Sequence, residues 1–534
     1  MNRRSASNFE EGHDSGTIPL PRPLKQKIKD LLVALSLANL IFLRASLDLL
    51  FDENRFYDRL PVTNVELLAL IFNVCWVTAI IWLGMRLVHR FRGPAPQLIL
   101  HLVFFSLLFF PADFIRAKYF AIPDYQVLSF LKQPFAILGM AVLIPLVLWQ
   151  HRRVAVAIAG LLGILSSFAL VILVKIILLI LGATQIRQCD PGMLAPLSAV
   201  RAGQPRVVWM IFDELDYRLV FEQRPAGVKL PEFDQLENET LRANNAYSPA
   251  DGTVFSMTQA ILGQQMIVKQ AGCDLQVTRP GTGETTTFNS LPNLFSDSRQ
   301  LGFNTALVGW FIPYDRLLSG QLNFCQWYPW PPFESARGAT FSSTVRRQIA
   351  SLAWSFRVRQ VYADLCQDSL QTAISVSTNA SYGLALFHLP PPHRPGVYNA
   401  TKHKISIWDT IFRMSGSQGY FNNLALADYE LGEIRQAMVT SGQWDKTWII
   451  ISADHSWRSS RNFDGKRDLR IPFFIKPPGP AGTEVYAQQF NTLLTHDLIL
   501  AILRSQLTNQ QDVVNWLDTH RDEQNFIPAS STAD

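Results

Sequence analysis

Two short apolar runs in this sequence each stop at residues that could bind a metal ion. Residues 448–451 (Trp-Ile-Ile-Ile) are followed, after Ser-Ala, by Asp454 and His455. Residues 207–212 (Val-Val-Trp-Met-Ile-Phe) are followed by Asp213. Carboxylates and imidazoles are common protein ligands of divalent cations. An adjacent carboxylate and imidazole could equally act as an acid/base pair or cap the loop after a strand.

Both runs have the composition of strands that are buried on both faces of a parallel sheet. Each run is short, continuously apolar and bounded by polar residues. In such sheets, ligands and chemistry collect beyond the carboxyl ends of the strands. We therefore expect Asp213, Asp454 and His455 to meet at one edge of the sheet and to share a cation.

Two further stretches place polar side chains where an anion could bind. Thr253 follows Gly252 at the start of an apolar helix, where backbone N–H groups and the helix dipole favour an anion. The same pattern also fits a simple N-cap threonine. His388 and His393 lie in a proline-rich loop after another apolar run, where they could hold a substrate anion or protonate a leaving group. A surface loop without a function is the alternative for these two histidines.

The stretches that carry these residues alternate between strand-like and helix-like patterns over residues 206–510. This alternation predicts an α/β domain with a mostly parallel central sheet. The expected strands are 207–212, 304–308, 383–387, 447–452 and 471–475, and the expected helices are 230–243, 254–263, 290–301, 421–440 and 492–505. Residues 183–205 are expected to form a linker and residues 511–534 a C-terminal tail.

Residues 31–182 are overwhelmingly apolar and predict a membrane region of five helices. The five segments lie near 31–51, 65–88, 97–112, 134–150 and 154–182, and most approach the roughly 20 residues that span a bilayer. Residues 1–30 are polar and lack the pattern of a cleavable signal peptide, so a cytoplasmic tail is expected. Lysine and arginine are in excess on the side of this tail, which predicts a cytoplasmic N-terminus. Five spans would then place residues 190–534 outside the cytoplasm.

The charge and the cysteine content limit which partners and which cellular compartment are expected for this protein. The net charge is +5 over 534 residues, and the basic residues concentrate beside the apolar segments, so the lipid bilayer is the expected partner and nucleic acid is not. The five cysteines include no CxxC pair, which argues against a zinc cluster and allows one or two disulfides in an oxidising compartment. Arg44 and Asp48, four residues apart in the first segment, could hold a lipid headgroup or form an ion pair near the interface.

Taken in order, these stretches resemble the alkaline phosphatase superfamily, and specifically its sulfatase-like branch, over residues 205–505. Residues 207–213 look like the opening strand with its metal-binding acid. Thr253, with Ser256 three residues later and Gly263 ten later, has the spacing of the nucleophile turn. Residues 452–455 (Ser-Ala-Asp-His) are similar to the most specific signature of the family.

The resemblance implies roles for individual residues. Thr253 would be both nucleophile and metal ligand, and the metal would be a divalent ion such as Mn, Zn, Mg or Ca. The full set that it implies comprises the metal ligands Asp213, Thr253, Asp454 and His455, the substrate-binding residues His393 and His388, and the possible additional residues Glu214 and Lys466.

One departure from the sulfatase pattern points to phosphate chemistry. Sulfatases carry Cys or Ser followed by x-Pro-Ser-Arg, and the first residue is converted to formylglycine. Residues 253–257 here are Thr-Val-Phe-Ser-Met, so sulfate chemistry through an aldehyde hydrate is not expected. Thr at this position resembles the membrane-anchored lipoteichoic acid synthases and phosphoethanolamine transferases, which also carry five N-terminal spans.

These observations predict a bacterial inner-membrane enzyme with a periplasmic, metal-dependent domain. It would transfer or hydrolyse a phosphoryl-linked headgroup through an ester of Thr253, with a phospholipid as donor and an envelope glycan or lipid as acceptor. A sulfuric-ester hydrolase or a phosphodiesterase is the alternative within the enzymes. A non-catalytic, membrane-tethered sensor or binding module is the alternative of another class.

Overall fold

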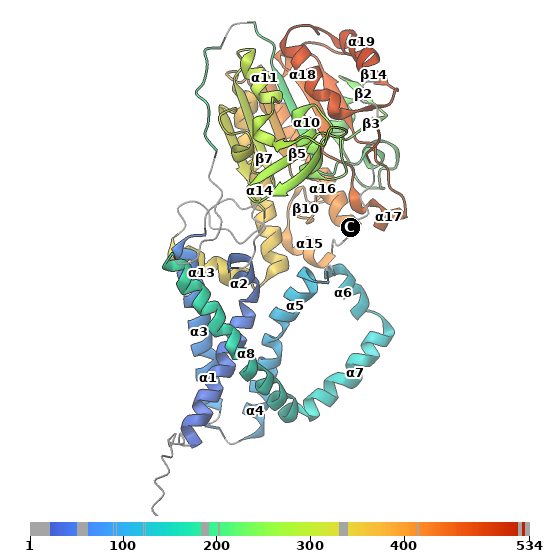
Figure 1. Ribbon diagram of the computed structural model, residues 1–534. Helices are drawn as coiled ribbons and strands as arrows, with labels where there is room; N and C mark the ends of the chain where they lie inside the picture. The colour runs from blue at the N-terminus through green and yellow to red at the C-terminus, as the bar shows by residue number, and fades with distance from the viewer. Residues whose placement is uncertain are drawn as a thin grey trace, which may run out of the picture.

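The computed structural model has two parts, a group of N-terminal helices and an α/β domain at one end of them (Figure 1). The residues that it describes are 22–50, 62–88, 90–91, 93–120, 122, 124–182, 192–200, 203–330, 340–413, 416–521 and 526–528. Most of the expected tail (1–30) and part of the expected linker (183–205) therefore lie outside the described residues.

An eight-stranded sheet, in the order β14-β2-β13-β12-β1-β9-β7-β8, forms the centre of the domain. β13 runs antiparallel to its neighbours β12 and β2. The other described strand pairs of this sheet are parallel. The predicted mostly parallel α/β fold is thus confirmed. The strands are β1 (Val207–Phe212), β2 (Leu241–Ala243), β7 (Thr305–Trp310), β8 (Phe324–Tyr328), β9 (Leu384–Leu389), β12 (Trp448–Ala453), β13 (Phe473–Lys476) and β14 (Glu484–Tyr486).

Shorter strands form three small sheets beside the central one. β4, β5 and β6 make an antiparallel sheet, while β10 pairs with β11 and β15 pairs with β3. Their bounds are β3 (Ala246–Tyr247), β4 (Ile267–Ala271), β5 (Asp274–Thr278), β6 (Thr285–Thr287), β10 (Tyr398–Asn399), β11 (Lys404–Ile405) and β15 (Phe490–Asn491).

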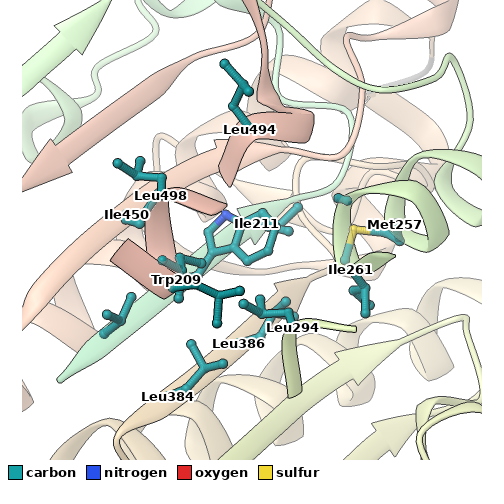
Figure 2. Packing of buried hydrophobic residues seen from close by; sticks show 14 of the residues in the cluster. Trp209, Ile211, Met257, Ile261, Leu294, Leu384, Leu386, Ile450, Leu494 and Leu498 are labelled. Atoms are coloured by element: carbon teal, nitrogen blue, oxygen red, sulfur yellow. The ribbon is translucent and has the colours of Figure 1, made fainter. Parts of the chain in front are cut away.

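Helices cover both faces of the sheet and bury alternate residues of its strands. Trp209 and Ile211 of β1 point to one face, where Met257 and Leu498 pack with them (Figure 2). Met210 belongs to the cluster on the opposite face. The helices of the domain are α9 (Pro231–Leu236), α10 (Thr253–Leu262), α11 (Leu294–Gln300), α12 (Tyr314–Leu317), α13 (Phe341–Ala350), α14 (Trp354–Thr378), α15 (Ile407–Arg413), α16 (Ser417–Thr440), α17 (Arg461–Asp464), α18 (Thr495–Leu503) and α19 (Gln510–His520).

Two sequence expectations inside this domain need correction. Residues 230–243, expected as one helix, divide into α9 and strand β2, because the chain turns after α9 to reach the sheet. Residues 510–520, most of them assigned to a C-terminal tail, form α19. Val513 and Leu517 lie four residues apart on one face of α19 and are buried in the core.

The N-terminal region contains fewer candidate spans than the five expected. Among the described residues, three stretches are long and apolar enough to cross a membrane, 64–88, 94–118 and 151–180, and a fourth is possible if α1 and α2, which meet at 65°, count as one span. α7 has 16 residues, about 24 Å at 1.5 Å per residue, which is shorter than a typical hydrocarbon core. The helices are α1 (Arg22–Ile41), α2 (Leu43–Leu50), α3 (Asn64–Val88), α4 (Pro94–Leu107), α5 (Phe109–Lys118), α6 (Asp124–Leu131), α7 (Pro134–Trp149) and α8 (His151–Ile180).

The α/β domain is docked on these helices through α13 and the start of α14. The amide of Asn73 in α3 donates to Gln348 Oε1 in α13 at 2.9 Å, and both side chains are buried. The guanidinium of Arg44 lies 3.7 Å from the centre of the Trp354 ring, while Asp48 pairs with Lys118 at 2.8 Å. Arg44 therefore helps to dock the domain through Trp354.

Candidate metal centre and active site

The register of the sheet brings the three predicted metal ligands together. Phe212, at the end of β1, is level with Ala453 in β12 and Leu389 in β9, so the residues that follow β1 and β12 leave the sheet at the same edge. One ligand atom from each of Asp213, Asp454 and His455 lies within 4.8 Å of the others, and all three residues are buried. The predicted cluster at this edge is present in the structure.

Backbone groups orient the Asp454 carboxylate and leave one of its oxygens open. Oδ1 accepts hydrogen bonds from the backbone N–H of Glu214 at 3.0 Å and of His455 at 2.8 Å. Glu214 reaches this position with a φ of 66°, which is uncommon for a residue other than glycine. Oδ2 of Asp454 lies 3.3 Å from His455 Nε2 without forming a hydrogen bond, and Oδ1 of Asp213 is likewise buried without a hydrogen-bond partner.

Buried carboxylate oxygens without partners are costly unless a cation or a donor compensates them. Two carboxylates and one imidazole within 4.8 Å supply the oxygen and nitrogen donors that Zn²⁺ or Mn²⁺ accepts. The residues present therefore fit a divalent metal, which Asp213, Asp454 and His455 would hold.

Thr253, the expected nucleophile, is the first residue of α10 and reaches the same centre. Its Oγ1 lies 3.5 Å from Asp213 Oδ2 and 3.3 Å from His455 Nε2. The hydroxyl of Ser256, one turn later, donates to the backbone carbonyl of Asp454 at 2.5 Å. That bond fixes the start of α10 against the end of β12, so the hydroxyl of Thr253 faces the proposed metal ligands.

His388 also belongs to this centre. Its imidazole is fully buried, with Nε2 3.6 Å from Asp213 Oδ2 and Nδ1 2.8 Å from the hydroxyl of Tyr314. Tyr314 can approach because residue 309 is glycine, where a Cβ would lie 2.5 Å from the Tyr314 ring. Sequence reasoning did not find Tyr314, since no pattern around it indicates contact with a histidine 74 residues away.

His393 lies at the rim, half-buried, and its ring meets Trp310 edge-on at 5.2 Å. Its backbone carbonyl accepts hydrogen bonds from the Tyr362 hydroxyl at 2.7 Å and from the Asn423 amide at 2.8 Å. These contacts hold the loop after β9 against α14 and α16. His393 therefore has a fixed backbone and a side chain that is open to a ligand on one side.

The two additional residues suggested by the family resemblance have different positions. Glu214 is buried beside the centre and accepts a hydrogen bond from Arg458 Nε at 3.3 Å. Burial alone would raise the pKa of Glu214, but the nearby cationic groups, His393 first among them, lower it below its usual value. Lys466 is exposed and lines a separate cavity with Arg218 and Arg467. No hydrogen bond or ion pair among the described residues joins the Lys466 side chain to the metal cluster.

The buried charges at the centre stabilise one another. Burial disfavours the charged form of His455, yet the carboxylates, with Asp454 foremost, outweigh this effect and raise the pKa of His455. Burial likewise disfavours ionised Asp454, and the adjacent His455 and His388 lower the pKa of Asp454 in return. Asp454 is thus favoured in the ionised form that a cation requires, and a metal ion bound by His455 would displace the proton that these carboxylates favour on its imidazole.

Comparison with known proteins assigns the family. The sequence profile of the sulfatase family matches residues 205–504. The chain belongs to the sulfatase family. Its α/β domain with a mostly parallel sheet agrees with the fold that the sequence analysis predicted. No curated protein matches it.

Solved structures similar to this sulfatase-family chain share little sequence with it. Ps i-CgsB in complex with k-i-k-neocarrahexaose is 12% identical, with a TM-score of 0.42, over 60% of this chain and 77% of that one. A protein of the alkaline phosphatase superfamily from Vibrio parahaemolyticus is 15% identical, with a TM-score of 0.38, over 60% of this chain and 72% of that one. The phosphonate monoester hydrolase SpPMH from Silicibacter pomeroyi is 14% identical, with a TM-score of 0.35, over 56% and 73%.

Proposed function

We propose that this protein is a metal-dependent enzyme that transfers a phosphoryl-linked group through a covalent ester of Thr253. The observation that carries the proposal is the position of the Thr253 hydroxyl. It lies 3.3 Å from His455 and 3.5 Å from Asp213, beside carboxylate oxygens that have no partner. A hydroxyl at a metal centre is a suitable nucleophile, because a cation lowers its pKa and neutralises negative charge on a phosphoryl group.

The side chains around Thr253 suit a displacement in two steps. In the first step, Thr253 Oγ1 forms a bond to phosphorus as the bond to the leaving oxygen breaks, and the hydroxyl proton passes toward Asp213 Oδ2, to which it is directed. His393, at the rim, would give a proton to the leaving oxygen. In the second step, an acceptor hydroxyl or water gives its proton to His393 and attacks the same phosphorus as the bond to Thr253 Oγ1 breaks, and Thr253 takes back the proton from Asp213. Tyr314 holds His388 beside Asp213 throughout.

Two observations favour phosphate over sulfate as the reacting group. The position of the nucleophile holds threonine, which is not the Cys or Ser that sulfatases convert to formylglycine. The residues that follow, Val-Phe-Ser-Met, also lack the arginine of the sulfatase pattern. A sulfuric-ester or phosphodiester hydrolase remains the second candidate, because the family is that of the sulfatases and water can replace the acceptor.

The arrangement of the two regions supports a lipid-borne donor. The segments that follow the site strands, including α15 and α17, lie at the end of the domain that faces the N-terminal helices (Figure 1). The contacts of Gln348 and Trp354 dock the domain on helices that are apolar enough to span a membrane. We propose a phospholipid donor, an envelope glycan or lipid acceptor, and a bacterial inner membrane with a cytoplasmic N-terminus. The disulfide of Cys273 agrees with an oxidising, extracytoplasmic compartment.

Mass spectrometry of the peptide that contains Thr253 tests this function. The full chain would be reconstituted with Mn²⁺ or Zn²⁺ in vesicles of phosphatidylethanolamine and phosphatidylglycerol, with an aryl sulfate as the comparison substrate. We expect a phosphoryl-linked adduct on Thr253 and release of diacylglycerol. Sulfate release with an unmodified Thr253 would favour the hydrolase. Metal binding without any turnover would favour the non-catalytic sensor.

A further inference from the structure

A second polar cavity, of about 630 Å³, lies outside the metal centre. We call it the arginine cavity. It is formed by the turn of η1 (Arg218–Glu222), the segment 466–470 and residues from two other segments. Its charged lining residues are Arg218, Glu222, Lys466, Arg467, Asp468 and Arg470. Four of them are cationic side chains, so the cavity could take a ligand of the opposite charge to the one at the metal centre.

Arg218 lines this cavity, and part of its guanidinium has no hydrogen-bond partner. Its side chain is 4% exposed, and Nη1 pairs with Asp464 Oδ2 at 2.6 Å. The remaining nitrogens, Nε and Nη2, are buried and have no partner. The N–H groups on these two nitrogens are parallel and match two oxygens of one phosphate group. A buried guanidinium with this edge unpaired is stabilised when an anion binds there.

Each arginine of the cavity wall pairs with a carboxylate, yet some N–H groups of Arg218 and Arg467 have no partner. Arg467 is 4% exposed, pairs with Asp251, and has a buried Nε without a partner. Lys466 is exposed and adds a third positive charge. The two carboxylates of the wall, Glu222 and Asp468, both bind Arg470, at 2.8 Å and 2.6 Å. The acidic groups of the wall are thus already paired, whereas cationic N–H groups are still open.

From these contacts we propose that the arginine cavity binds a phosphate group at a site separate from the metal centre. Arg218 would bind two phosphate oxygens through Nε and Nη2, and Lys466 would add charge at the mouth. Arg467 links the cavity to the nucleophile turn, because its partner Asp251 lies two residues before Thr253. The ligand is an anionic phosphate, carried either by a lipid headgroup or by a small soluble molecule. Binding there does not depend on turnover at Thr253.

Calorimetric titration of the full chain in non-ionic detergent tests this site. EDTA is present so that phosphate cannot bind through a metal at the other centre. Inorganic phosphate and the short-chain lipid dihexanoyl phosphatidic acid are titrated in turn. We expect binding of at least one ligand, weakened about tenfold or more by Arg218→Gln, because a hydrogen bond to a charged group is lost. Lys466→Gln should weaken it about threefold, as an exposed charge contributes less. Lys269→Gln, which removes an exposed lysine on β4, is the matched control and should bind as the unaltered protein does.

The outcomes separate the sources and decide the proposal. Binding of phosphatidic acid alone would identify a lipid headgroup as the ligand, and binding of both would identify the phosphate group itself. If Arg218→Gln does not fold, Lys466→Gln still carries the test, since its side chain is exposed. Absence of binding, or equal binding by Lys466→Gln and the Lys269→Gln control, would overturn the proposal.

Discussion

The metal centre and the arginine cavity contain the same kind of feature with opposite charge. At the metal centre the buried atoms without partners include carboxylate oxygens of Asp213 and Asp454. In the arginine cavity they are guanidinium nitrogens of Arg218 and Arg467. Because a buried polar atom is more stable when it is paired, the first set suits a cation and the second an anion. The sign of the unpaired atoms indicates the ligand at each place.

The two regions also differ in how the chain builds them. The metal centre lies at the ends of two adjacent strands, β1 and β12, whose hydrogen bonds fix its geometry. The arginine cavity is made of a turn and a loop, and ion pairs hold its walls. The Asp251–Arg467 pair joins the two regions. Substitutions in each of the two regions test whether the metal centre and the arginine cavity act separately.

Thr253→Ala should have the largest effect on activity, and this effect should be confined to the metal centre. Loss of a covalent nucleophile is expected to lower kcat by about 1,000-fold or more, and the measurement is diacylglycerol release from vesicles. Thr258→Ala is the matched control, because Thr258 lies on the same helix and bonds only to the carbonyl of Val254 among the contacts described. Phosphate binding in EDTA should be the same in both variants. Substantial activity of the Thr253→Ala protein would contradict the proposed covalent step.

Asp251→Asn should affect both regions, mainly through stability. It leaves the charge of Arg467 buried without its partner, which costs about 3–5 kcal/mol for a buried pair. Asp464→Asn removes the partner of Arg218 in the same way, but the Asp464 side chain is 25% exposed where that of Asp251 is 3% exposed. We therefore expect thermal unfolding to show a larger fall in melting temperature for Asp251→Asn. Equal falls would mean that the deeper burial of the Asp251–Arg467 pair does not increase its contribution to stability.

Tyr314→Phe should have the smallest effect and should act on the metal centre alone. It removes the hydrogen bond to His388 Nδ1, worth about 1 kcal/mol, so kcat/KM should fall about fivefold with little change in stability. Tyr328→Phe is the control, since the hydroxyl of Tyr328 bonds to Asp368 and Thr372 on α14. An unchanged rate for Tyr314→Phe would show that the orientation of His388 is not limiting.

The sequence predicted the metal centre because the relevant signal is local. An apolar run that stops at an acidic residue marks both the strand and the point where it ends, so Asp213, Asp454 and His455 could be placed at one edge without coordinates. The helix that starts at Thr253 was recognised in the same way, from Gly252 and the apolar residues that follow. The parallel sheet then brings these separate signals together.

The remaining features depend on contacts between distant segments. Arg218 and Lys466 are about as far apart in the sequence as Asp213 and Asp454, but no periodic pattern places a turn against a loop. Lys466 was instead expected near the metal centre. Tyr314 meets His388 only because the sheet sets β7 beside β9. The described residues give three or four candidate spans where five were expected, and hydropathy does not show that α7 ends after 16 residues.

Metal content tests the central claim most directly. The full chain would be stripped with EDTA, reloaded with Mn²⁺ or Zn²⁺, dialysed and measured by elemental analysis beside Asp454→Asn. The account predicts at least one tightly bound divalent ion per chain in the unaltered protein. It also predicts loss of that ion in Asp454→Asn, because one of the two carboxylates with an open oxygen is removed. A folded, unaltered protein that binds no divalent metal, or an Asp454→Asn variant that retains it fully, would contradict the account.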